Sequence, residues 1–160
     1  MGCSKEETLK IIGERSRDNA RTPIQWTDGK NAGFTSGTPW IEVCKNYKKI
    51  NAAAQTGDDE SIFSFYKKLI EIRKKERIIS EGTIEFTSKK DEGVIAYIRE
   101  LKGEKVRVFA NLKDRELEVE AADIGKDVNN VLVQNYADLP RYSDGKLTLR
   151  AYEIVAFHQN

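Results

Sequence analysis

Apolar and polar positions follow two different periodicities along the chain, and the periodicity changes near Ile79–Gly82. Before that point, two segments carry apolar residues at the three- and four-residue spacing that is typical of helices. After it, apolar residues recur at every second position, as in strands with one buried face. We therefore expect two domains, one over residues 1–79 and one over residues 80–160.

The first half is predicted to contain two helices. Ser4 and Glu7 form a capping box, and the apolar residues behind it predict a short helix that runs toward Arg15. The stretch Ser61–Lys75 has acidic residues before its start, a broad apolar stripe, and cations in its last turns. Cations there suit the helix dipole, and such a stripe serves core packing far more often than ligand binding.

The second half contains seven short segments predicted to be strands, with no helix between them. Lys102-Gly103 and Asp144-Gly145 stand where hairpin turns belong. This pattern is typical of an antiparallel sandwich or barrel. The segments are Thr83–Thr87, Gly93–Glu100, Lys105–Asn111, Glu116–Glu120, Asn130–Asn135, Lys146–Leu149 and Tyr152–His158. We expect one apolar face from Val94, Ala96, Ile98, Val106, Val108, Ala110, Leu117 and Val119.

Residues 16–55 show neither the helical nor the strand periodicity. A structureless stretch of about 40 residues is improbable inside a compact domain unless it is functional or lies on a scaffold that other residues supply. Its most distinctive segments are Ser16-Arg-Asp-Asn-Ala-Arg-Thr-Pro-Ile-Gln-Trp26, Asn31-Ala-Gly-Phe34 and Gly37-Thr-Pro-Trp-Ile41.

These segments resemble the signature of oligo-1,6-glucosidases, dextran glucosidases and trehalose-6-phosphate hydrolases, in glycoside hydrolase family thirteen of the alpha-amylase superfamily. The resemblance implies an α+β chain: the tail of a (β/α)₈ barrel, namely a loop and the last barrel helix, followed by an all-β antiparallel sandwich. The long loop would then be ordered on a barrel whose earlier strands lie outside these 160 residues.

The resemblance also implies substrate-binding residues, which act only in the intact enzyme: Arg17, Asp18 and Arg21. Guanidinium groups form forked hydrogen bonds, and Asp18 and Gln25 can exchange hydrogen bonds with sugar hydroxyls. Two roles stay open for the arginines, since they either shape the sugar-binding subsites or tie the loop to the barrel rim. For the tryptophans of this region, burial is expected rather than stacking on sugars.

Catalytic residues are expected elsewhere. A retaining glycosidase needs two carboxyl groups about 5 Å apart, and no segment here matches the family motifs that supply them. The only histidine, His158, is followed by Gln159. We expect no hydrolysis by this chain alone. Two alternatives are a stand-alone β-sandwich that binds carbohydrate or protein, and one half of a split glucosidase.

Composition excludes several other classes. Lys and Arg number 27 against 26 for Asp and Glu, so no net field favours nucleic acid or an anionic membrane. Cys3, Cys44 and a single histidine predict no disulfide framework, metal site or cofactor. No apolar run approaches the roughly 20 residues of a membrane span, and a cytoplasmic location is expected. The expected partners are an alpha-linked oligosaccharide, in the intact enzyme, and the missing N-terminal portion of the barrel.

Overall fold

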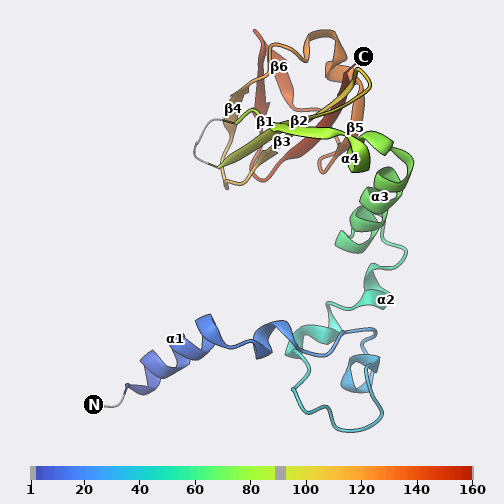
Figure 1. Ribbon diagram of the computed structural model, residues 1–160. Coiled ribbons are helices and arrows are strands. Elements are labelled where there is room, and N and C mark those ends of the chain that lie inside the picture. Colours follow the sequence, from blue (N-terminus) through green and yellow to red (C-terminus); the bar gives the residue numbers. More distant parts are fainter. Residues whose placement is uncertain (1–2, 89–92, 160) are drawn as a thin grey trace. The chain divides into compact units, whose positions relative to one another are not determined.

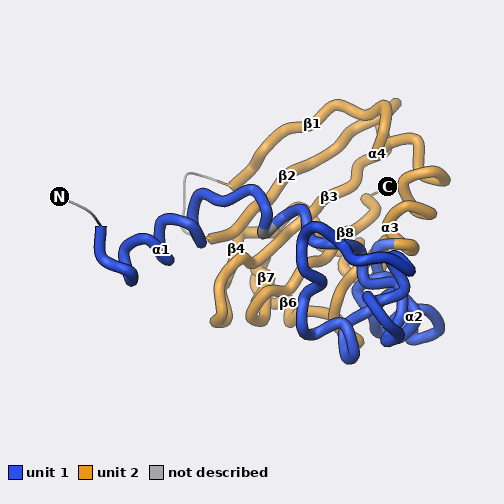
Figure 2. The backbone as a smooth tube through the Cα atoms, turned by 90° about the horizontal axis from the view of Figure 1, so that it is seen from below, with its two compact units in different colours: residues 1–66 blue, residues 67–160 orange. Residues whose placement is uncertain are grey.

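The computed structural model describes residues 3–88 and 93–159. The chain divides into two compact units, Met1–Tyr66 and Lys67–Asn160, which Figure 2 shows in blue and orange. Helix α3, Ile62–Lys75, begins in the first unit and ends in the second. The first unit contains short helices and loops, whereas the second contains the strands (Figure 1).

Helix α1, Lys5–Arg15, begins at the predicted capping box. The Ser4 hydroxyl accepts a hydrogen bond from the Glu7 N–H at 3.2 Å, and the Glu7 carboxylate accepts one from the Ser4 N–H at 2.8 Å. These bonds, the one to the backbone above all, lower the pKa of Glu7. The unit continues with the 3₁₀ helices η1 (Asp18–Ala20), η2 (Lys30–Gly33) and η3 (Lys45–Lys48), and with α2 (Ala52–Gln55).

The second unit is the predicted antiparallel sandwich. One sheet has the strand order β1-β2-β3-β8-β5 and the other has β4-β7-β6, and all the strand pairs are antiparallel. Buried side chains from both sheets form one core between them. The strands are β1 (Thr83–Phe86), β2 (Val94–Leu101), β3 (Glu104–Asn111), β4 (Leu117–Glu120), β5 (Val131–Gln134), β6 (Arg141–Ser143), β7 (Lys146–Leu149) and β8 (Ile154–Gln159).

Both predicted hairpin turns are confirmed. Lys102 and Gly103 have φ values of 54° and 93° and join β2 to β3, while Asp144 and Gly145, at 52° and 77°, join β6 to β7. Such positive φ values match the right-handed twist of the flanking strands. Strand β6 was not predicted, because its three residues are too few to show alternation. The same holds for the 3₁₀ helix η4, Gly125–Asn129.

The prediction of one shared apolar face was wrong for β3. Ala96 lies opposite Phe109, whereas Val106 lies opposite Arg99. Ala96 and Phe109 therefore pack in the core between the sheets. Val106 packs on the outer face of the five-stranded sheet, against Ile78 of helix α4 (Arg77–Glu81). Since β3 is covered on both faces, its apolar pattern alone does not show which residues share a side.

Candidate functional site

Arg17, Asp18 and Arg21 lie together on one turn, η1. Arg17 precedes this 3₁₀ helix and Arg21 follows it. The Ala20 N–H donates to the Arg17 carbonyl at 3.1 Å, and the Arg21 N–H donates to the Asp18 carbonyl at 3.0 Å. The Ser16 hydroxyl accepts from the Asp18 N–H at 3.2 Å. Local backbone bonding thus brings the three predicted site residues onto one short surface turn.

The three charged side chains on this turn are exposed. Within residues 3–88 and 93–159, none of Arg17, Asp18 and Arg21 makes a side-chain hydrogen bond or an ion pair. Their donors and acceptors are therefore free to meet a ligand or another part of a protein.

Gln25 holds two parts of the long loop together. Its side-chain amide donates to the Ile50 carbonyl. The Gln25 carbonyl accepts from the Ala52 N–H at 2.8 Å, and the Trp26 carbonyl accepts from the Ala53 N–H at 2.9 Å. Gln25 therefore closes the long loop on itself through its side-chain amide and its backbone carbonyl.

The segment Asn31–Gly33 is a left-handed turn that the side chain of Asn31 holds in place. Its three residues have φ values of 51°, 56° and 68°. The Asn31 amide donates to the carbonyls of Thr35 and Gly37 at 3.1 and 2.7 Å. A Cβ atom on Gly33 would lie 2.7 Å from the Thr27 hydroxyl, in addition to the strain of the positive φ. This part of the motif therefore shapes the loop.

Asn51 is a loop residue whose role the sequence analysis missed. It is 5% exposed, and its side-chain oxygen accepts from the Ala54 N–H at 2.9 Å at the start of α2. Its amide donates to the Tyr47 carbonyl at 2.8 Å. An Asn before Ala-Ala-Ala-Gln is a helix N-cap signal, which could have revealed this role.

The aromatic residues of the loop are uncovered within this chain. Trp26, Phe34 and Trp40 are 50%, 49% and 89% exposed. The burial expected for the two tryptophans is thus not provided by the residues that the structure describes. Among those same residues, no group of three or more His, Cys, Asp or Glu could hold a metal ion, and no helix is long and apolar enough to cross a membrane.

Two family models together match both halves of this chain. The family model described as "Alpha amylase, catalytic domain" matches residues 1–82, and that described as "Alpha-amylase SusG C-terminal domain" matches residues 94–155. The chain belongs to the alpha-amylase family. The predicted resemblance and the predicted fold class, a barrel tail followed by a β-sandwich, are confirmed.

Individual relatives show which enzymes of the family the chain is similar to. The chain is 40% identical to the trehalose-6-phosphate hydrolase of Bacillus subtilis (strain 168) over 157 residues, which are 98% of this chain and 28% of that protein. It is 40% identical to the oligo-1,6-glucosidase of Bacillus cereus over 153 residues, which are 95% of this chain and 27% of that protein. The chain thus spans little more than a quarter of the length of these relatives.

Solved structures give the same picture. The trehalose-6-phosphate hydrolase of Bacillus licheniformis matches with a TM-score of 0.86 and 40% identity, over 98% of this chain and 29% of its own. The trehalulose synthase of Pseudomonas mesoacidophila MX-45 matches with a TM-score of 0.87 and 36% identity, over 98% and 28%. The architecture described above is therefore that of the corresponding part of these enzymes.

Proposed function

We propose that this chain supplies the C-terminal part of a retaining alpha-glucosidase that acts on short alpha-linked glucosides. The observation that carries the proposal is the 40% identity to a trehalose-6-phosphate hydrolase over 98% of the chain, together with its 28% share of that protein. The two carboxyl groups of a retaining glycosidase would come from barrel residues outside this sequence. The chain by itself is then not a hydrolase.

Helix α3 supports a missing partner of this kind. Ile62 and Tyr66, on its apolar stripe, are 74% and 63% exposed, and Phe63 and Ile70 are each nearly half exposed. A group of large apolar side chains on one helix marks a surface that another protein part covers. We infer that the N-terminal barrel portion covers this helix. The same observation favours a second candidate, one half of a split glucosidase, over a stand-alone binding module.

The proposal includes a location and a domain boundary. Cys3 and Cys44 are free thiols, which supports the reducing cytoplasm because thiols persist there. The near balance of charges supports an oligosaccharide, rather than nucleic acid or an anionic membrane, as the ligand. A boundary near residue 79 stays a prediction, and the end of the catalytic-domain match at residue 82 supports it.

A chimaera tests the function. In it, this chain replaces the matching stretch of the Bacillus subtilis trehalose-6-phosphate hydrolase. We expect the chimaera to hydrolyse trehalose 6-phosphate or an alpha-1,6-linked glucose disaccharide, because the barrel residues of the relative supply the carboxyl pair. Release of glucose is the measurement. The relative without its matching stretch, and this chain alone, should release none. A folded but inactive chimaera, or glucose release by this chain alone, would contradict the proposal.

Within that chimaera, Arg17→Ala and Arg21→Ala are expected to lower kcat/KM by about 10- to 100-fold each, the loss of a hydrogen bond from a charged donor. We propose that Arg17, Asp18 and Arg21 contact the substrate. Measurements of kcat/KM and of Tm separate this role from attachment of the loop to the barrel rim. The matched control is Arg15→Ala, at the exposed end of α1, which should change kcat/KM less than about twofold. A lower Tm with unchanged kcat/KM would exclude substrate contact.

A further inference from the structure

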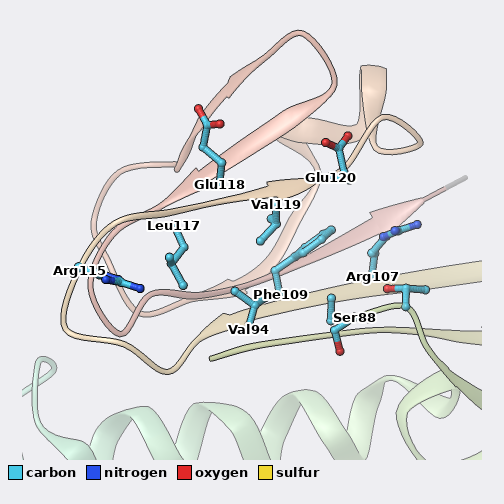
Figure 3. A pocket seen from close by; sticks show the side chains of 11 residues that line it. Ser88, Val94, Arg107, Phe109, Arg115, Leu117, Glu118, Val119 and Glu120 are labelled. Atoms are coloured by element: carbon cyan, nitrogen blue, oxygen red, sulfur yellow. The ribbon is translucent and has the colours of Figure 1, made fainter. Parts of the chain in front are cut away.

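A pocket of about 370 Å³ lies between the two sheets of the sandwich, where β4 forms the edge of the three-stranded sheet (Figure 3). Its walls are mainly apolar. Val94 and Phe109 come from β2 and β3 of one sheet, while Leu117 and Val119 come from β4 of the other. The volume is within the range of small-molecule sites. All the lining residues belong to the second unit, so the pocket does not depend on the proposed function.

The small side chain of Ala96 leaves the pocket open. Ala96 lines the pocket and is paired with Phe109 across β2 and β3. On its other side, the N–H groups of Thr87 and Ser88 donate to the Ala96 carbonyl at 2.9 and 3.1 Å. A methyl group therefore stands between the ring of Phe109 and the Thr87 side chain, where a larger residue would fill the space.

Two polar atoms on the pocket wall are buried and lack a hydrogen-bond partner among the residues that the structure describes: Arg107 Nε and Thr87 Oγ1. Arg107 is 8% exposed, and burial lowers its pKa. Its Nη1 pairs with Asp123, and its guanidinium carbon lies 5.4 Å from the centroid of the Phe109 ring. Because buried polar groups are nearly always hydrogen-bonded, these two atoms indicate an oxygen that the described residues do not supply.

We propose that this pocket binds a small neutral molecule that joins a ring-sized apolar body to one acceptor oxygen. The apolar body packs against Phe109, Leu117 and Val119. The oxygen accepts hydrogen bonds from both Arg107 Nε and the Thr87 hydroxyl. The ligand is neutral because Asp123 already balances the charge of Arg107.

The surroundings of the pocket also favour a neutral ligand. Glu118 and Glu120 line its rim on β4, and Figure 3 shows their side chains on the side of that strand away from Phe109. Their negative charge opposes an incoming anion. Arg115, which also lines the pocket, lies beyond Leu117, well separated from Arg107 in the same view. Among residues 3–88 and 93–159, a carboxylate would therefore meet no unpaired cation beside the two unpartnered atoms.

Methyl NMR of the full chain, titrated with cyclohexanone, tests the site. We expect saturable shifts at the methyl groups of Val94, Leu117 and Val119. Methylenecyclohexane has the same shape without the oxygen, and it should bind about three- to tenfold more weakly, the worth of one hydrogen bond. Cyclohexanecarboxylate should bind more weakly than the ketone. No saturable shift, equal binding of the hydrocarbon, or tighter binding of the anion would overturn the proposal.

Substitutions of pocket residues test where the ligand binds. Thr87→Val removes the hydroxyl and should reduce the preference for the ketone over the hydrocarbon. Ala96→Leu should fill the pocket and abolish the shifts that the ketone causes and those that the hydrocarbon causes. If Ala96→Leu does not fold, the Thr87→Val result alone tests where the ligand binds. Thr83→Val is the matched control at the start of β1, the strand that ends just before Thr87, since Thr83 is exposed and its hydroxyl donates to the Glu100 carbonyl. A Thr83→Val effect equal to that of Thr87→Val would overturn the assignment.

Discussion

Replacing Arg150 with alanine is expected to lower the free energy of unfolding of the sandwich by about 3–5 kcal/mol. The reason is Glu153, whose side chain is 0% exposed. The Arg150 guanidinium donates to both carboxylate oxygens of Glu153, and the Arg150 N–H donates to one of them at 2.7 Å. Without the guanidinium, a buried charge would lose its counter-charge, and its desolvation would be uncompensated.

Arg150 also holds the neighbouring loop. Its guanidinium donates to the Asp138 carbonyl at 2.6 Å and stacks on the ring of Tyr136 at 4.1 Å from the centroid. The hydrogen bond to Glu153 raises the pKa of Arg150, so the arginine keeps its charge at any pH at which the protein is folded. The stability that it provides should therefore not decline toward alkaline pH through deprotonation of Arg150.

Urea unfolding of the full chain, followed by far-UV circular dichroism, measures the Arg150→Ala effect. Arg141→Ala is the matched control, because Arg141 pairs with Glu116 at a site where the two side chains are 73% and 59% exposed. That pair should contribute less than about 1 kcal/mol. Replacing Arg150 and Glu153 together by Met and Leu should cost less than Arg150→Ala alone. Equal effects of Arg150→Ala and Arg141→Ala would refute the buried-charge explanation.

Local sequence signals predicted the elements of this fold well. Neighbouring residues determine the capping box at Ser4 and Glu7 and each of the two hairpin turns. The structure confirms all three features. Such signals suffice because a cap or a two-residue turn is satisfied by atoms close in sequence. Strand β6, by contrast, has three residues and follows Pro140, so its own pattern is too short to predict it, although the Asp144-Gly145 turn pairs it with β7.

Contacts between residues of different strands could not be predicted from the sequence. Nothing local shows that Phe109 faces the core while Val106 faces α4, because both are apolar and either face of β3 could point inward. The Arg150–Glu153 pair was equally hidden, since charged residues three apart are usually exposed. Glu153 is buried because the two sheets surround it, and the local sequence does not predict that burial.

The candidate site was predictable in part. Arg17, Asp18 and Arg21 were named from a motif, and the structure places them on one exposed turn. The motif did not distinguish these residues from Gln25 and Asn31, whose amides hold the loop together. The same types of polar side chain suit either substrate recognition or loop closure, so only their hydrogen-bond partners separate the two roles.

Replacing Phe157 with alanine is expected to destabilise the sandwich by about 3–5 kcal/mol, the usual effect of truncating a buried phenylalanine. Phe157 is 0% exposed and lies in the core between the two sheets. Its ring meets that of Phe109 edge-on, with the centroids 6.4 Å apart and an interplanar angle of 71°. Because β8 lies between β3 and β5, the cavity would open at the centre of the five-stranded sheet, where the backbone cannot easily collapse into it.

Phe86→Ala is the matched control for this prediction. Phe86 is 65% exposed on the edge strand β1 and touches Tyr97 at a centroid distance of 5.8 Å. Its removal should cost less than about 1 kcal/mol, because little apolar area leaves a packed core. Both variants are compared by urea unfolding with circular dichroism, since Trp26 and Trp40 belong to the first unit and do not report on the sandwich. A Phe157→Ala effect no larger than that of Phe86→Ala would mean that the two sheets are not held together by the core around Phe109.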